Sequence, residues 1–288
     1  MKISNHTDRL EKRFGTLSAI RMTADAGFEA IDYSMYTPDG AVFGRGGVAL
    51  VREMRRVSDG CGVTFNQAHA PFAKYKPGEE HSEENRKLFD FTRRSIEIAG
   101  ELGAERIIVH PAFICPYISA DERFEMNMEI YSRLLEVARS NGVIIAIENM
   151  YGRHKDKSSK LIRNVCSHAE EFIRYVDALD TPYITACVDV GHAGLVGESA
   201  SSMIRALDKR VTSIHLHDND FYEDIHTLPF FGDINFNSII RALRDISYTG
   251  DVTLEADGFL KDLPDELWSH GLRFMASVAA YIRAELVK

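Results

Sequence analysis

The feature that most constrains the fold is an alternation of short apolar segments with longer segments of helical periodicity. The short segments are rich in β-branched residues, and each is long enough to form one buried strand. Strands that alternate with helices form parallel sheets, because parallel neighbours must be joined by a crossover connection. We expect eight such strands, at Lys2–Asn5, Ala30–Ser34, Val63–His69, Arg106–His110, Val143–Glu148, Tyr183–Asp189, Val211–His217 and Asp251–Glu255.

Eight strand–helix units predict an α/β fold in which the strands close into a (β/α)8 TIM barrel. The chain has 288 residues, which suits one barrel, and no low-complexity linker divides it. We therefore expect a single domain over residues 1–288. Three connections are long, and each follows the carboxyl end of a predicted strand, where barrel active sites are built: Tyr36–Gly47, Tyr151–Asn164 and Asn219–Asn235.

The helical segments carry recognisable start and stop signals. Residues 82–102 begin with a serine followed by acidic residues, and residues 121–140 are followed by Asn-Gly. Ser167 and Glu170 have the spacing of a capping box, which predicts a helix from there to Leu179.

Composition narrows the class of protein. Hydrophobic residues make up 45% of the chain, which is enough for a sizeable core. The net charge is −9, and this acidic balance argues against a nucleic-acid partner because phosphate binding favours basic surfaces. The polar start at Met1–His6 predicts no signal peptide, and no apolar run is long enough to cross a bilayer. We expect a cytoplasmic protein whose cysteines, in no CxxC pair, fill the core: Cys61, Cys115, Cys166 and Cys187.

Polar residues of metal-binding type gather where the predicted strands end. Six successive strands, the third to the eighth, end in a histidine or a carboxylate, and further residues of this kind follow the sixth and seventh. The strand-end residues are His69, His110, Glu148, Asp189, His215, His217 and Glu255, and those that follow are His192, Asp224 and His226.

The barrel fold would bring these groups together around one axis. A single strand-end histidine is more often a hydrogen-bonded structural residue, and Glu148 or Glu255 alone could pair with a helix lysine or arginine. Six successive strands that all end in such residues are not explained in this way. Converging carboxylates repel one another unless a cation lies between them. The sequence therefore predicts a mixed oxygen and nitrogen site for Mn²⁺, Zn²⁺, Co²⁺ or Mg²⁺.

Other conspicuous residues have plainer interpretations. We expect Trp268 in the core and Arg153–Lys157 in an exposed loop, although that basic stretch could instead hold a substrate phosphate. Phe230–Phe231 could pack on a sugar face or simply pack the loop. Five histidines have no matching context and are expected to be solvated: His6, His81, His154, His168 and His270.

The strand-end motifs resemble the xylose isomerase-like superfamily of sugar phosphate isomerases and epimerases, which also contains the type-four apurinic endonucleases. The resemblance spans nearly the whole chain. Each motif is weak alone, but their order and spacing are specific. They are His-Ala-Pro-Phe at 69–72, Val-His-Pro at 109–111, Ile-Glu-Asn at 147–149, Asp-Val-Gly-His at 189–192, His-Leu-His-Asp-Asn at 215–219, Asp-Ile-His at 224–226 and Leu-Glu at 254–255.

The resemblance implies a set of metal ligands. Members that epimerise or isomerise sugars hold one divalent metal, which maps onto Glu148, Asp189, a strand-seven histidine and Glu255. The His-x-x-Asp spacing favours His215, whereas ketose 3-epimerases with a His-x-His strand favour His217. The endonuclease branch uses three metals, and its further ligands match His69, His110, His192, Asp224 and His226.

The resemblance also implies an activity. We expect a small-molecule sugar substrate, and a metal-dependent isomerase or epimerase that works by proton transfer through a metal-stabilised enediolate, with Glu148 and Glu255 exchanging the proton. His192 and a strand-seven histidine would bind substrate oxygens. The alternatives are a multi-metal phosphodiesterase or endonuclease, a dehydratase or lyase, and a metal-stabilised sugar-binding protein. The sequence leaves the oligomeric state open, including a homo-oligomer.

Overall fold

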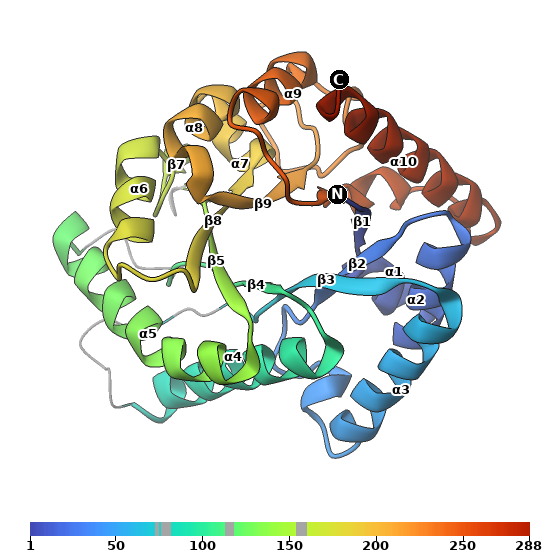
Figure 1. The fold of residues 1–288 in the computed structure, drawn as a ribbon, viewed down its shortest axis with the longest axis horizontal. Coiled ribbons are helices and arrows are strands. Elements are labelled where there is room, and N and C mark those ends of the chain that lie inside the picture. The colour runs from blue at the N-terminus through green and yellow to red at the C-terminus, as the bar shows by residue number, and fades with distance from the viewer. Residues whose placement is uncertain (73–74, 76–81, 113–117, 154–159) are drawn as a thin grey trace.

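Eight parallel strands close into a barrel at the centre of the molecule, and helices surround it (Figure 1). The computed structural model describes residues 1–72, 75, 82–112, 118–153 and 160–288. All eight predicted strands are present, which confirms the TIM-barrel prediction. They are β1 (Ile3–His6), β2 (Ala30–Ser34), β3 (Thr64–His69), β4 (Arg106–Ile108), β5 (Ile144–Glu148), β8 (Ile184–Asp189), β9 (Val211–Leu216) and β10 (Val252–Leu254).

Each barrel strand pairs with its neighbours in chain order, and β10 pairs with β1 to close the ring. None of the helices in the described ranges combines the length and apolar character needed to cross a membrane. The helices are α1 (Asp8–Phe14), α2 (Thr16–Asp25), α3 (Gly47–Cys61), α4 (Glu83–Leu102), α5 (Ala120–Asn141), α6 (Ala169–Asp177), α7 (Val190–Leu195), α8 (Ala200–Leu207), α9 (Phe236–Asp245) and α10 (Asp265–Leu286), with short 3-10 turns η1 (Ala41–Phe43), η2 (Asp208–Arg210) and η3 (Asp257–Leu260).

The helix boundaries follow their caps. The Ser82 hydroxyl accepts the Asn85 backbone N–H at 3.1 Å and starts α4 as predicted. The predicted capping box at Ser167 is wrong. The cap of α6 is His168, whose ring accepts the Glu171 N–H at 3.4 Å. Cys166 has a φ of 57°, so the backbone is still in a turn directly before Ser167, where the capping box was predicted to begin.

The core lies mainly between the strands and the surrounding helices, and a small apolar layer of Ile108, Ala146 and Cys187 forms a separate buried cluster. Trp268 is buried, as predicted, and its indole N–H donates to the Leu263 carbonyl at 3.0 Å. Cys166 and Cys187 are buried, but the prediction fails for Cys61, which is exposed as the last residue of α3. Cys115 lies outside the described residues.

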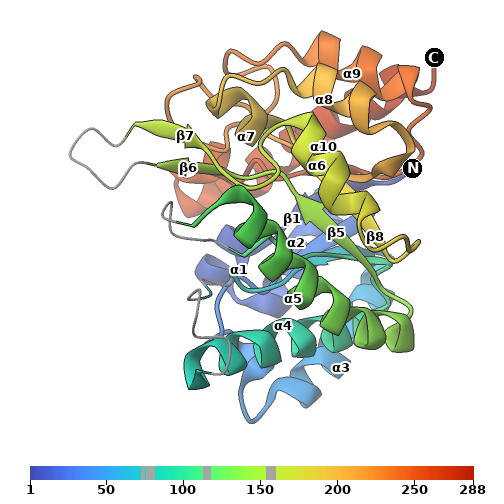
Figure 2. The same cartoon turned by 90° about the vertical axis from the view of Figure 1, so that its left-hand side faces the viewer.

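The three long connections all follow barrel strands at the mouth, meaning the carboxyl ends of the strands. Residues 36–47 contain η1, and residues 151–164 contain an antiparallel hairpin of β6 (Tyr151–Arg153) and β7 (Leu161–Arg163). Figure 2 shows this hairpin extending away from the barrel. In the loop after β9, the Asp218 carboxylate accepts backbone N–H groups of Asn219, Phe230 and Ile234 at 2.9–3.0 Å, which fixes the course of the loop.

Candidate metal centre

Every strand of the barrel contributes a histidine or a carboxylate, which lies at or just beyond the carboxyl end in seven strands and in the middle of β2. The sequence predicted these groups for six strands, and the structure adds His6 on β1 and Asp32 on β2. A cavity of about 540 Å³ opens above them at the mouth. Its walls include Glu148 and Glu255 together with His6, Asp8, Arg9, Tyr36, Phe72, His110, Met150, Tyr151, Gly152, Arg153, His192, Asp224, His226 and Asp257.

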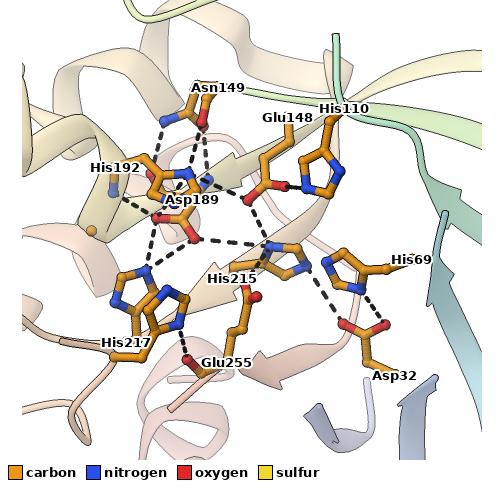
Figure 3. A network of polar contacts seen from close by, with 12 residues as sticks. Asp32, His69, His110, Glu148, Asn149, Asp189, His192, His215, His217 and Glu255 are labelled. Atoms are coloured by element: carbon orange, nitrogen blue, oxygen red, sulfur yellow. Dashed lines mark hydrogen bonds and ion pairs between the residues drawn. The ribbon is translucent and has the colours of Figure 1, made fainter. Parts of the chain in front are cut away.

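Glu148, Asp189, His215 and Glu255 form what we call the four-residue cluster (Figure 3). One ligand atom from each lies within 4.8 Å of the others, and all four side chains are buried. The His215 Nδ1 atom is 3.0 Å from Glu148 Oε1, 2.9 Å from Glu255 Oε2 and 3.9 Å from Asp189 Oδ2. The arrangement therefore directs three carboxylates and one imidazole nitrogen at a common point.

The charges in this cluster suit a cation. Burial raises the pKa of Glu148, but His215 and His110 outweigh it and hold the pKa well below its ordinary value. Burial acts on Glu255 in the same way, and His215 again lowers the pKa below its ordinary range. Glu148 and Glu255 are thus buried and ionised, Asp189 lies beside them, and the four-residue cluster itself contains a single imidazole. The donor set fits a divalent metal ion that takes oxygen and nitrogen ligands.

The two strand-seven histidines face different neighbours. His215 joins the four-residue cluster, whereas His217 Nε2 lies 3.0 Å from both Asp189 oxygens and 4.0 Å from Asp224 Oδ1. The Asp189 carboxylate thus lies between the two imidazoles (Figure 3). This geometry favours His215 over His217 as the nitrogen ligand of the four-residue cluster.

His192, His217, Asp224 and His226 form a second cluster whose donor atoms also lie within 4.8 Å of one another. His226 Nε2 is 3.1 Å from Asp224 Oδ2, and its ring stacks on that of His217 with centroids 3.9 Å apart. Burial lowers the pKa of His226, but Asp224 raises it to about 10. The imidazolium form of His226 therefore neutralises the charge of the Asp224 carboxylate. A metal ion bound at the second cluster would have to displace a proton from His226.

A third group of donor atoms joins histidines from β3 and from the residues after β4 to Glu148. His69, His110 and Glu148 offer donor atoms within 4.8 Å of one another, with His110 Nε2 at 2.9 Å from Glu148 Oε2. Beneath them, His69 Nδ1 lies 2.9 Å from Asp32 Oδ1, and the Gln67 amide donates to Asp32 Oδ2 at 2.8 Å. Asp32 is buried and was missed in the sequence, although an acid within the apolar strand Ala-Ile-Asp-Tyr-Ser was a usable signal.

Several further cavity residues escaped sequence reasoning, among them His6, Arg9, Tyr36 and Asp257. His6 was expected to be solvated, but only 2% of its surface is exposed, because β1 extends one residue beyond the predicted end. The Tyr36 hydroxyl donates to Glu255 Oε1 at 2.5 Å, and Asp257 follows β10 in η3. Tyr36 lies in a loop and Asp257 begins a short 3-10 turn, and in neither place does a periodic pattern signal which side chain faces the cavity.

The remaining expectations have mixed outcomes. His270 is exposed as predicted, and His168 is half-buried as the cap of α6. Phe230 packs on the rings of Phe236 and Tyr281, and Phe231 on those of Phe259 and Phe274, which favours loop packing over sugar contact. Arg153 lines the cavity, whereas His81, His154 and the rest of the basic stretch to Lys157 lie outside the described residues.

Known proteins resemble this chain in sequence and in fold. An uncharacterised protein of Methanocaldococcus jannaschii is 28% identical over 194 residues, which cover 65% of this chain and 62% of that protein. A fructoselysine 3-epimerase of Shigella flexneri is 23% identical over 181 residues, covering 62% of this chain and 61% of the epimerase. The chain thus spans less than two thirds of the length of these curated relatives.

A solved structure described as a D-tagatose 3-epimerase-like protein has the same fold, with a TM-score of 0.75 and 21% identity over 99% of this chain and 100% of that one. A family model described as "Xylose isomerase-like TIM barrel" matches residues 20–278, which is most of the sequence. The closed barrel and its ring of polar strand ends agree with that match. The chain belongs to the xylose isomerase-like TIM-barrel family.

Proposed function

We propose that this protein is a divalent-metal-dependent isomerase or epimerase of a small sugar. The observation that carries the proposal is the pairing of Glu148 and Glu255. Their carboxylates approach His215 Nδ1 at 3.0 and 2.9 Å, and both line the cavity. Two carboxylates that face one substrate can remove a proton from a carbon and return a proton to it. The similarity to a fructoselysine 3-epimerase supports the same class of reaction.

The four-residue cluster would hold the metal, with His215 Nδ1 as its nitrogen ligand. A divalent metal in such a site acts as a Lewis acid that polarises a carbonyl and makes the adjacent C–H more acidic. One of Glu148 and Glu255 removes that proton, and the other returns it to the opposite face or to the neighbouring carbon. The first outcome is epimerisation and the second is isomerisation.

Neighbouring residues orient the substrate. His192 lines the cavity, and its Nδ1–H donates to the Asn149 carbonyl at 3.0 Å, which leaves Nε2 to face substrate oxygens and Asp224. The rings of Phe72 and Tyr151 line the same cavity and can cover the C–H face of a sugar. Exclusion of water by these side chains strengthens the electrostatic interactions inside.

The test is solvent deuterium exchange into ketohexoses and inososes with each of Mn²⁺, Zn²⁺, Co²⁺ and Mg²⁺. Deuterium should enter at the carbon next to the carbonyl, and Glu148→Gln and Glu255→Gln should each reduce exchange by at least about a thousandfold. Glu136→Gln is a matched control, because Glu136 is exposed on α5. Full exchange in either of the two site variants would contradict the role assigned to that residue.

A second candidate function is multi-metal phosphodiester hydrolysis. The observation that favours it is the presence of further metal-type groups, namely the second cluster and the His69–His110–Glu148 group. In such enzymes, metals activate water and clamp a phosphate. Metal content measured by mass spectrometry separates the candidates, because one ion per chain supports the sugar enzyme and two or three support the hydrolase. Release of phosphate from a model phosphodiester gives the independent check.

A further inference from the structure

His6 is a buried imidazole whose ring nitrogens are both without a hydrogen-bond partner among the described residues. It stands at the end of β1 and lines the cavity, with its ring 5.1 Å from the rings of Tyr36 and His69. An imidazole carries a donor and an acceptor when neutral, and buried polar atoms of folded proteins are nearly always paired. A side chain held in this way beside a cavity is suited to bind a ligand.

Asp257 lies beside His6, and Arg9 contacts Asp257. The Asp257 carboxylate in η3 accepts the Arg9 Nε–H and the Arg9 backbone N–H, both at 3.2 Å. Asp257 Oδ2 lies 3.9 Å from His6 Nδ1, too far for a direct hydrogen bond. Arg9 and Asp257 also line the cavity. One hydroxyl group of a ligand could therefore contact His6 and Asp257 together.

The chemistry of this group selects the kind of ligand. Arg9 and Asp257 carry opposite charges and contact each other, and both ring nitrogens of His6 are available for hydrogen bonds, so the set can donate to a ligand and accept from it. Hydroxyl groups both donate and accept, whereas a phosphate would face the Asp257 and Asp8 carboxylates in the same wall. None of the three residues belongs to the four-residue cluster or to the second cluster.

We propose that His6, Arg9 and Asp257 form a subsite for hydroxyl groups of an uncharged sugar that lie away from the reacting carbon. The inference rests on the proposed function and adds the substrate class to it. Contacts with remote parts of a substrate contribute to catalytic efficiency, so a truncated substrate that lacks those parts loses their benefit. The subsite therefore governs the preference for a long sugar over a short one.

The experiment compares deuterium exchange into D-fructose, D-tagatose and D-psicose with exchange into dihydroxyacetone, which has the carbonyl but no remote hydroxyls. His6→Ala, His6→Asn and Asp257→Asn should lower the ratio of kcat/KM for the best ketohexose to that for dihydroxyacetone by at least about tenfold. His270→Ala, at an exposed histidine on α10, should keep the wild-type ratio. Two independent variants at His6 and one at Asp257 guard against a folding defect in any single one.

A second measurement needs no turnover. D-fructose should shift the ring nitrogen resonances of His6 in NMR spectra of the full-length protein, and dihydroxyacetone at the same concentration should not. An unchanged ratio, or equal losses for ketohexoses and dihydroxyacetone, would overturn the subsite. So would a preference for D-fructose 6-phosphate that Arg9→Gln abolishes. If no sugar undergoes exchange, the proposed function fails, and the absence of any His6 shift would then reject the subsite separately.

Discussion

At the scale of single residues, the two carboxylates of the proposed chemistry are not equivalent. Glu148 has an imidazole beside its second oxygen, with His110 Nε2 at 2.9 Å. Glu255 instead accepts the Tyr36 hydroxyl at 2.5 Å. Burial and the nearby Glu255 charge raise the pKa of Tyr36 well above its ordinary value, so the phenol keeps its proton and remains a donor. Tyr36 is therefore a positioning residue for Glu255.

The substitution Tyr36→Phe tests this role. It removes the donor but keeps the ring, so Glu255 loses its fixed orientation, and metal affinity should fall about tenfold to a hundredfold. Isothermal titration with Mn²⁺ or Zn²⁺ measures the effect without any substrate. Tyr281→Phe is the control, because that side chain is 49% exposed. An unchanged dissociation constant in Tyr36→Phe would show that the hydrogen bond does not position a ligand.

At the scale of elements, the junction between β8 and α7 organises both clusters. Asp189 ends β8 and caps α7, with its Oδ1 accepting the His192 N–H at 2.7 Å. The Asn149 amide exchanges two hydrogen bonds with the Asp189 backbone, at 2.8 and 2.9 Å, which ties the ends of β5 and β8 together. The β8–α7 turn and its hydrogen bonds to Asn149 thus place Asp189, Asn149 and His192 relative to one another.

Gly191 lies in this turn, and a Cβ atom there would come within 2.0 Å of His217 Cε1. Gly191→Ala should therefore displace His217 from the Asp189 carboxylate, which lies 3.0 Å from His217 Nε2, and reduce metal binding at the four-residue cluster by at least about tenfold, because the neighbours of a ligand set its geometry. Metal titration followed by mass spectrometry reports the change. Gly60→Ala, in open space on α3, should bind metal as the wild type does and gain about 0.5–1 kcal/mol of stability. Equal metal binding by both variants would contradict the steric argument.

At the scale of the whole molecule, the barrel carries a half-buried carboxyl group with a raised pKa outside the candidate metal-binding clusters. Glu11 in α1 accepts the Thr7 hydroxyl at 2.6 Å and the Thr16 hydroxyl at 3.1 Å. Burial raises its pKa from 4.5 to about 8. The folded state then holds the proton more tightly than the unfolded state does. The stability from this group is complete below pH 4.5 and is lost as the pH rises through about 8.

The variant Glu11→Gln tests this linkage, because glutamine stays neutral at every pH. From pH 5 to pH 8.5 the wild type should lose roughly 1–3 kcal/mol of unfolding free energy relative to the variant, allowing for partial exposure. Urea denaturation of metal-free protein at both pH values gives the difference. Exposed Glu136→Gln should show no such trend. The same offset at both pH values would contradict a raised pKa for Glu11.

Much of the fold and of the candidate site could be predicted because the signals are local. The eight strands follow from short apolar runs between helical segments, and strand-end residues such as Glu148 and Asp189 follow from where those runs stop. The predictions from sequence were wrong at positions where no local pattern specifies the structure. His6 depended on one more residue of β1 pairing with β2, and the cap of α6 depended on a positive φ at Cys166.

The sequence by itself determined the barrel, its strand count and the polar character of its mouth, because periodicity and strand ends are properties of neighbouring residues. Only the tertiary structure decided which nitrogen faces which carboxylate. Closure of β10 on β1 brings His6 toward Asp257, and loop conformations bring Tyr36 to Glu255 and His226, at a φ of 45°, to Asp224. Those contacts join residues far apart in the chain, and no local pattern specifies them.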